Sequence, residues 1–322
     1  MQPRKWRFSF AMRENPVFRP LYALIRAFPR LAWRRRAPAA IRPLPARSPA
    51  LVKSIAVPRV QLLRSGLEVS RLGLGTSRLH YLSTDESRVA LIHGALDMGV
   101  THFDTARLYG DGLAERVLGK ALKGRRGSAT IATKFGLLPS AVIEALGSAG
   151  APLRVGRALL RRMGFLRQPR RAWTPAVLQR SLHASLKALA TDRVDILFLH
   201  DPRRAEIGEE LVAALAMARQ SGKIRHLGVA GDAREAAAIL AAFPGQFDIV
   251  QTPEDGWDAG LVPDFTFGVL NAGPQRLGAA GPSDGDVRAR LAHALLRRPS
   301  GALLAGTSRL GHLRALAEAA TP

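Results

Sequence analysis

The chain has 322 residues, of which 47% are hydrophobic, 23% charged and 6% aromatic, and it contains no cysteine. This apolar fraction is enough for a sizeable core and excludes a wholly disordered chain. The lack of cysteine excludes a disulfide scaffold, a cysteine-ligated zinc or iron–sulfur site and a thiol nucleophile. The formal net charge is +23, and its distribution along the chain is uneven.

The first fifty residues carry nearly half of this excess charge. They hold twelve Lys and Arg and one acid, Glu14, which is a net charge of +11, and several prolines that would interrupt a long helix. We therefore predict that residues 1–55 are a flexible basic extension of a folded domain at 56–322. A basic amphipathic stretch at 16–33 leaves contact with an anionic membrane surface or nucleic acid as an alternative to a solvated tail.

Neither a secretory signal nor a membrane-spanning segment is expected. Arginines interrupt the apolar part of the extension, and no stretch of about 18 uncharged apolar residues occurs. The sequence therefore predicts a cytoplasmic protein. No recognised nucleic-acid-binding motif is present either, so no specific nucleic-acid partner is expected.

From residue 57 onward the pattern predicts alternating strands and helices. A short β-hairpin is expected at 60–63 and 67–70, around the turn at Arg64 to Gly66. Eight apolar runs then predict strands at 72–75, 101–105, 130–133, 194–199, 224–229, 247–251, 265–270 and 302–305. Amphipathic segments of helical length lie between most of them, at 84–98, 114–122, 175–190, 206–221, 233–243, 286–297 and 310–319. This alternation predicts an α/β fold in which eight parallel strands close a (β/α)8 TIM barrel.

A doubly wound sheet is the competing architecture. It is disfavoured because Gly73 and Gly75 are not followed by the third glycine of a dinucleotide fingerprint, and no Walker sequence occurs. Two stretches depart from regular alternation. Residues 137–173 form a long arginine-rich insertion, and residues 252–264 are so short and so rich in Pro and Gly that the sixth helix is expected to be vestigial.

Four ionisable residues lie at or just after predicted strand ends. Asp104 ends the second strand, Tyr109 follows five residues later, Lys134 ends the third and His200 ends the fourth. The carboxyl ends of barrel strands meet at one face, so these side chains are expected to share a pocket. Each alone could be a helix cap, a rim residue or a core residue. The four together, in this order, favour a common site.

The chemistry of this set is specific. A nearby lysine ammonium should lower the pKa of a tyrosine phenol, which is ordinarily about 10. A carboxylate would keep the ammonium charged, and a neutral histidine could orient a substrate carbonyl. Such a set protonates an oxygen that gains negative charge as hydride reaches its carbon. No side chain can deliver hydride, so a nicotinamide cofactor is implied.

Several of these segments resemble the aldo-keto reductase superfamily, whose members are (β/α)8 barrels that use NADPH. Residues 99–119, with Glu115 and Gly119 at the usual places, resemble its first signature, and 133–136 its lysine motif. The resemblance covers roughly residues 58–320 and includes segments 182–202, 222–229, 247–251 and 306–314. It implies that Tyr109 is the general acid, that Lys134 and Asp104 activate it, and that His200 orients the carbonyl.

The same resemblance implies a cofactor site with no metal. The residues expected to contact the cofactor are Gly75, Thr76, Gln251, Gly306, Thr307, Ser308, Arg309 and His312. A guanidinium suits a 2′-phosphate, so NADPH is expected, with NADH left open. Three segments depart from the family pattern. Ala230-Gly231 stands where the family usually has Ser-Asn, and Ala315-Leu316 replaces the Glu-Asn pair that faces the adenine. Residues 271–274 lack the tyrosine that often stacks on the nicotinamide ring.

Two functions follow as expectations. The first is reduction of a small aldehyde or ketone to an alcohol, or the reverse reaction. The second is a catalytically weak barrel that senses nicotinamide nucleotide, with the basic N-terminus on an anionic surface. The physiological substrate and the oligomeric state are not specified by these residues.

Overall fold

The structure is a computed structural model that describes residues 55–145, 153, 169–255, 260–270 and 284–321. The chain divides into two units, residues 1–52 and residues 53–322, and every described residue belongs to the second. Three predictions concern residues outside those described: the basic extension, most of the insertion at 137–173, and residues 271–274. The predicted domain boundary after residue 55 stays a prediction.

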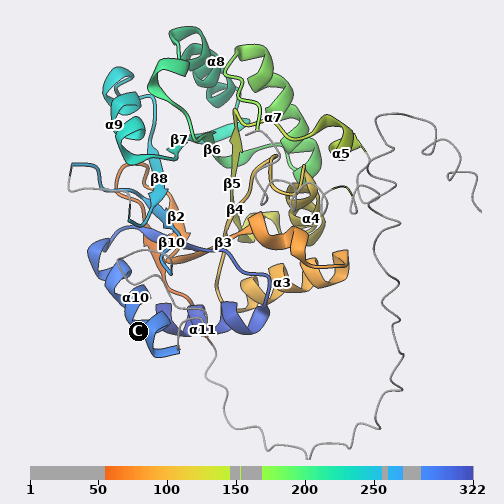
Figure 1. The fold of residues 1–322 in the computed structure, drawn as a ribbon, viewed down its shortest axis with the longest axis vertical. Coiled ribbons are helices and arrows are strands. Elements are labelled where there is room, and N and C mark those ends of the chain that lie inside the picture. Colours follow the sequence, from red (N-terminus) through yellow and green to blue (C-terminus); the bar gives the residue numbers. More distant parts are fainter. Residues whose placement is uncertain (1–54, 146–152, 154–168, 256–259, 271–283, 322) are drawn as a thin grey trace, which may run out of the picture. The chain divides into compact units, whose positions relative to one another are not determined.

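Eight parallel strands form a closed barrel, as Figure 1 shows. They pair in chain order, and the barrel closes where Leu303 lies opposite Leu72. All eight correspond to predicted strands, so the predicted TIM barrel is confirmed. Their bounds are β3 (Leu72–Gly75), β4 (His102–Asp104), β5 (Thr130–Phe135), β6 (Val194–His200), β7 (Ile224–Ala230), β8 (Ile249–Pro253), β9 (Phe265–Phe267) and β10 (Ala302–Ala305).

Helices surround the barrel (Figure 1). The main ones are α3 (Asp85–Asp97), α4 (Leu113–Ala121), α7 (Pro175–Leu189), α8 (Glu209–Gln220), α9 (Ala233–Ala242), α10 (Asp284–Arg297) and α11 (Leu310–Ala320). Shorter pieces are α5 (Ala141–Ala145), η1 (Thr76–Tyr81), η2 (Arg126–Ser128) and η4 (Arg204–Glu206). Thr84 and Thr174 cap α3 and α7, because each side-chain oxygen accepts a hydrogen bond from a backbone N–H of the first turn. No helix of the described residues is long and apolar enough to cross a membrane.

The helix predicted at 206–221 begins later than expected, at Glu209. Residues 204–206 form the separate turn η4, and Gly208 precedes the first turn of α8 in an extended conformation. The Glu206 carboxylate accepts a hydrogen bond from the Arg203 backbone N–H at 2.9 Å. This local bond holds η4 as its own turn, so amphipathic spacing alone placed the helix start too early.

The crossover from β8 to β9 has no helix in its described residues, 254–255 and 260–264. The sequence predicted that the sixth helix would be vestigial. Glu254 lies just after β8, and its Oε2 is 2.7 Å from Nη2 of Arg298, which follows α10. Both side chains are almost completely buried. This ion pair therefore joins the barrel wall to the end of α10.

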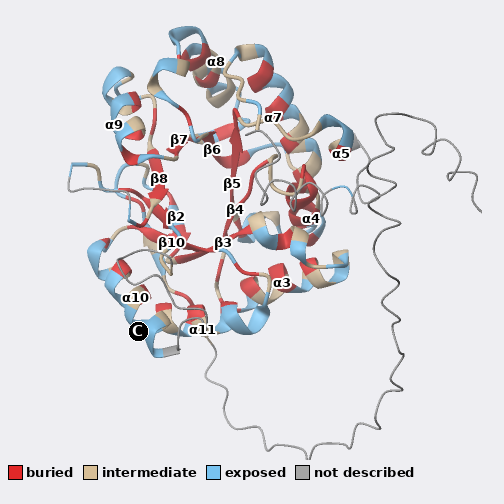
Figure 2. Cartoon of the chain, viewed as in Figure 1, coloured by how far each residue is buried: buried red, intermediate tan, exposed pale blue. Residues whose placement is uncertain are grey.

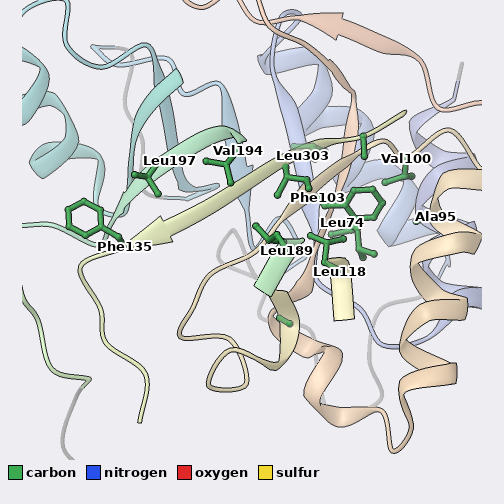
Figure 3. Packing of buried hydrophobic residues seen from close by; sticks show 14 of the residues in the cluster. Leu74, Ala95, Val100, Phe103, Leu118, Phe135, Leu189, Val194, Leu197 and Leu303 are labelled. Atoms are coloured by element: carbon green, nitrogen blue, oxygen red, sulfur yellow. The ribbon is translucent and has the colours of Figure 1, made fainter. Parts of the chain in front are cut away.

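The core has two parts because strand side chains alternate between the two faces of the barrel. Outward-facing residues such as Leu74 and Phe103 pack under the helices, where Figure 3 shows them beside Leu118 of α4. Figure 2 shows that most of the barrel strands are buried, whereas outer helices such as α8, α9 and α10 also carry exposed residues. Inward-facing residues form a second cluster with the hairpin β1 (Arg59–Gln61) and β2 (Glu68–Ser70), and its members include Leu62, Leu67, Val69, Ile196, Phe198 and Phe265.

Candidate active site

A cavity of about 1170 Å³ lies at the carboxyl ends of the barrel strands. Every strand contributes to its wall through a residue at or near its end: Gly75, Asp104, Lys134, His200, Ala230, Pro253, Phe267 and Ala305. Tyr109, from the loop after β4, lines the same cavity. The structure therefore brings the four predicted catalytic residues together at one site.

Lys134 and Asp104 form a buried ion pair on neighbouring strands. The Lys134 ammonium donates a hydrogen bond to a carboxylate oxygen of Asp104 and another, at 3.1 Å, to the backbone carbonyl of Thr105. The two side chains are 2% and 5% exposed. Burial alone would lower the pKa of Lys134, but Asp104 and Tyr109 raise it above its ordinary value. The lysine is therefore held as an ammonium beside the carboxylate.

Tyr109 lies against both Lys134 and His200. The Lys134 Nζ is 5.0 Å from the centroid of the tyrosine ring, and the His200 ring is 5.8 Å away, edge-on at 88°. Many atoms surround the ring, but Tyr109 is only partly buried because it borders the cavity. Its hydroxyl is thus placed beside a cation and within the space that a ligand can enter.

The pKa of Tyr109 departs from the sequence-based expectation. Burial raises it, the charge and hydrogen bond of Lys134 lower it, and the charge of Asp104 raises it again. Lys134 lowers the pKa as predicted, but burial outweighs this effect, so the net shift is upward. The phenol therefore keeps its proton near neutral pH and can act as a donor.

His200 is a neutral imidazole at the end of β6. Burial lowers its pKa to about 3, and the charges of Lys134 and Arg171 add to that effect. The residue pairs with Ala230 of β7. Its Nδ1 is buried and has no hydrogen-bond partner among the described residues. A neutral ring at this position can donate one hydrogen bond into the cavity, as the sequence predicted.

Most predicted cofactor residues line the cavity, namely Gly75, Gln251, Gly306, Thr307, Ser308, Arg309 and His312. Thr76 does not line it. Its hydroxyl donates a hydrogen bond of 3.1 Å to the backbone carbonyl of Asp104 and so supports β4. A contact between Thr76 and a cofactor stays a prediction.

Gln251 provides a direct test of fit for a nicotinamide group. The residue is 3% exposed, and its Oε1 has no hydrogen-bond partner within the described parts of the chain. A buried amide oxygen without a partner is costly unless a ligand donates to it. A carboxamide N–H is such a donor, so this wall of the cavity fits the cofactor.

A second wall fits anionic groups. Thr307 to Arg309 precede the eleven-residue helix α11, and the Arg309 N–H bonds to Thr307 Oγ1 at 3.1 Å. A helix N-terminus with a nearby guanidinium favours phosphate. Arg78 also lines this cavity, and the sequence did not predict it. Its side chain lies beside Gly306, because a Cβ placed on that glycine would be 3.7 Å from Arg78 Cδ. Its position three residues after the end of β3 was the available signal.

Four departures from the family pattern also face the cavity: Ala230, Gly231, Ala315 and Leu316. Their loss of polar side chains therefore concerns the site itself. Ala272 lies outside the described residues. No group of three or more His, Asp or Glu able to hold a metal ion occurs in the described ranges.

Comparisons with known proteins agree with this geometry. The model of the Aldo/keto reductase family matches residues 71–252. D-threo-aldose 1-dehydrogenase from a Pseudomonas species is 30% identical over 207 residues, covering 59% of this chain and 60% of its own. Aldo-keto reductase YhdN from Bacillus subtilis is 32% identical over 171 residues, or 51% and 44% of the two chains. The matches thus span between about two fifths and three fifths of these relatives' lengths.

Solved structures share the fold. An aldo-keto reductase from Bacillus halodurans superposes with a TM-score of 0.60 at 21% identity, over 81% of this chain and 90% of that one. One from Klebsiella pneumoniae in complex with NADPH gives a TM-score of 0.59 at 23% identity, over 81% and 89%. At this identity the likeness concerns the architecture.

Proposed function

Because the chain belongs to the aldo/keto reductase family, we propose that it is an NADPH-dependent oxidoreductase that interconverts a small aldehyde or ketone and its alcohol. One observation carries the proposal. Asp104, Tyr109, Lys134 and His200 line a single cavity. Lys134 forms an ion pair with Asp104 and lies 5.0 Å from the centroid of the Tyr109 ring, and that ring lies edge-on to His200. We also propose a cytoplasmic location, as the sequence predicted.

The cofactor supplies a hydride when it is bound. The chain's own residues orient the substrate carbonyl and donate a proton to its oxygen. His200, neutral because its pKa is lowered to about 3, donates a hydrogen bond that orients the carbonyl. As the carbonyl carbon accepts hydride, its oxygen gains negative charge and takes the proton from Tyr109 Oη. In alcohol oxidation the same proton moves back.

Lys134 and Asp104 make this proton transfer possible. The phenolate left on Tyr109 lies beside the Lys134 ammonium, which stabilises the developing charge. Asp104 offsets the desolvation of that ammonium. The raised pKa of the resting phenol keeps the proton on Tyr109 until the carbonyl oxygen becomes basic.

NADPH is the preferred cofactor in this proposal. Gln251 Oε1, which is buried without a partner among the described residues, would accept a hydrogen bond from the carboxamide. The residues about the start of α11, with Arg78 and Arg309, would hold the phosphates. The missing polar side chains at positions 230, 231, 315 and 316 weaken binding, each by about 1 kcal/mol, the usual net worth of a hydrogen bond.

The deciding experiment combines cofactor binding and turnover. Purified protein is titrated with NADPH by fluorescence, and reduction of 4-nitrobenzaldehyde and a quinone is followed. Oxidation of D-threo-aldoses with NADP is included because one relative is named for that reaction. Tyr109→Phe should lower turnover at least 100-fold, the lower range of general-acid contributions, while the NADPH dissociation constant stays within about twofold of wild type.

Tyr81→Phe is the matched control. Tyr81 is 64% exposed and does not line the cavity, so its hydroxyl should not affect turnover. Equal losses in both variants would refute the assigned role of Tyr109. Binding of NADPH without reduction of any carbonyl would instead favour the nucleotide-sensing alternative, which the apolar residues Ala230, Ala315 and Leu316 in the cavity wall motivate.

A further inference from the structure

Residues 170–172 are attached to the chain segment that follows β5. Leu137 and Arg171 form an antiparallel bridge, the Leu138 N–H bonds to the Arg170 carbonyl at 2.9 Å, and the Ala172 N–H bonds to the Gly136 carbonyl at 2.9 Å. Gly136 has a φ of +107°, and a Cβ there would lie 2.1 Å from the Trp173 ring. Arg171 is thereby held beside Leu137, which follows Lys134 by three residues in the chain.

The Arg171 side chain reaches from there to the segment that follows β6. Its Nε and Nη2 donate hydrogen bonds to the two carboxylate oxygens of Glu206 at 2.9 and 2.8 Å. Its Nη1 lies 3.3 Å from Asp201 Oδ2, and Nη2 also donates to the Asp201 backbone carbonyl. Arg171 thus binds both ends of the turn that runs from Asp201 to Glu206.

This turn begins directly after His200 in an unusual conformation. Asp201 has a φ of +54°, which few residues other than glycine adopt. Its N–H bonds to the Ala230 carbonyl at 2.6 Å, and it lies so close to Gly231 that a Cβ on that glycine would be 2.9 Å from Asp201 Cα. The backbone directly after His200 is therefore held in place by Ala230 and Gly231 of the neighbouring chain segment.

We propose that Arg171 is a positioning residue that holds His200 in register with Tyr109 and Lys134 by joining the segment after β6 to the segment after β5. The inference rests on the proposed function, because it concerns the geometry of carbonyl orientation. A planar guanidinium suits the task, since it makes two parallel hydrogen bonds to Glu206 and still reaches Asp201. A lysine ammonium lacks this planar fork and would not reproduce the two parallel hydrogen bonds to Glu206.

Arg171→Met tests the proposal against Arg170→Met. Arg170 is the adjacent arginine; it is exposed and has no ion pair among the described residues, so its replacement removes the same charge without loosening the turn. Arg171→Met should lower kcat about 10- to 100-fold, the range expected when a reacting group is misplaced by about 1 Å. The NADPH dissociation constant, measured by fluorescence, should stay within about twofold, and Arg170→Met should change neither.

Glu206→Gln and Arg171→Lys keep the test decisive if Arg171→Met folds poorly. Both should lower kcat in the same direction, and the double variant Arg171→Lys/Glu206→Gln should lose little more than either single variant, because both act through one contact. The primary isotope effect with 4-deuterated NADPH should rise as the hydride step becomes slower. Unchanged kcat, fully multiplicative losses, or a fall in kcat that only tracks the melting temperature would each overturn the proposal.

The control with unmodified protein separates the two proposals. A wild-type protein that reduces no carbonyl overturns the proposed function, and the role of Arg171 with it. A wild-type protein that is active while Arg171→Met and Glu206→Gln retain full kcat overturns only the role of Arg171.

Discussion

Lys134 and Asp104 form an ion pair inside the mouth of the barrel, where neither side chain is more than 5% exposed. Each group offsets the desolvation of the other, and Tyr109 lies against the same ammonium. The pair is thus part of both the stability of the barrel and the acidity of the proposed proton donor.

Asp104→Asn should therefore damage stability and activity together. It leaves the Lys134 ammonium buried without a counter-charge, a change that typically costs about 3–5 kcal/mol. We expect a lower urea midpoint and a turnover reduced by at least about tenfold. The double variant Asp104→Asn/Lys134→Met should regain much of the stability but none of the activity. A single variant as stable as wild type would contradict the ion-pair assignment.

Arg309→Gln should change cofactor choice. A charge-assisted hydrogen bond is worth about 1.5–3 kcal/mol, so loss of the guanidinium should raise the KM for NADPH about 10- to 100-fold. NADH has no 2′-phosphate, so its KM should change less than about twofold by the same reasoning. Steady-state kinetics with both cofactors measures this. An equal rise for NADH would assign Arg309 to some other part of the cofactor.

His102 and His200 should each contribute a loss of stability on mild acidification. Burial lowers the pKa of each to about 3, whereas an unfolded histidine titrates near 6.5. Between these values the unfolded chain binds more protons than the folded one, so the free energy of unfolding decreases as pH falls from about 6.5 toward 3. Urea midpoints at pH 7.5, 5.5 and 4.5 test this.

His102→Gln is the informative variant for that experiment. His102 stacks on Phe265 at 4.4 Å and shares a 2.9 Å hydrogen bond between its Nδ1 and Thr130 Oγ1. Glutamine keeps a hydrogen-bonding group but does not titrate, so the variant should lose part of the pH dependence. An unchanged slope would mean that other groups cause the acid sensitivity.

Glu115→Gln should be tolerated, although Glu115 is one of the signature residues. The carboxyl is 1% exposed and accepts a 2.6 Å hydrogen bond from Thr133 Oγ1, and burial raises its pKa. The folded state favours the protonated form, so ionisation above about pH 4.5 is a cost that glutamine avoids. The melting temperature at pH 8 should be equal or higher for Gln and clearly lower for Glu115→Ala. Equal losses would contradict this.

Deletion of residues 1–55 should leave barrel stability and turnover unchanged, as the predicted domain boundary after residue 55 implies. Deletion through Val57 should lower the melting temperature. Val57 is 5% exposed, and its N–H donates a 3.0 Å hydrogen bond to the Met98 carbonyl at the end of α3. Thermal unfolding of both truncations tests the boundary, and a loss of activity in the shorter deletion would move it toward the N-terminus.

The sequence by itself determined the barrel and the central set of side chains. Strand positions are readable because apolar runs recur between amphipathic segments, and a parallel barrel places every strand end at one face. Asp104, Lys134 and His200 sit at such ends, so their meeting follows from topology alone. The short, Pro- and Gly-rich stretch at 252–264 likewise predicted a vestigial sixth helix, and the described residues of that crossover, 254–255 and 260–264, contain no helix.

Only the tertiary structure decided the features that depend on burial and on distant contacts. The upward shift in the pKa of Tyr109 arises from the atoms packed around it, which no spacing rule reports. Thr76 supports β4 instead of lining the cavity, and Arg78 lines the cavity, because of where η1 folds. Arg171 and Glu206 lie 35 residues apart in the chain and meet because β5 and β6 are neighbours in the barrel. Local periodicity is encoded along the chain, whereas desolvation and long-range charge pairing exist only once the chain has folded.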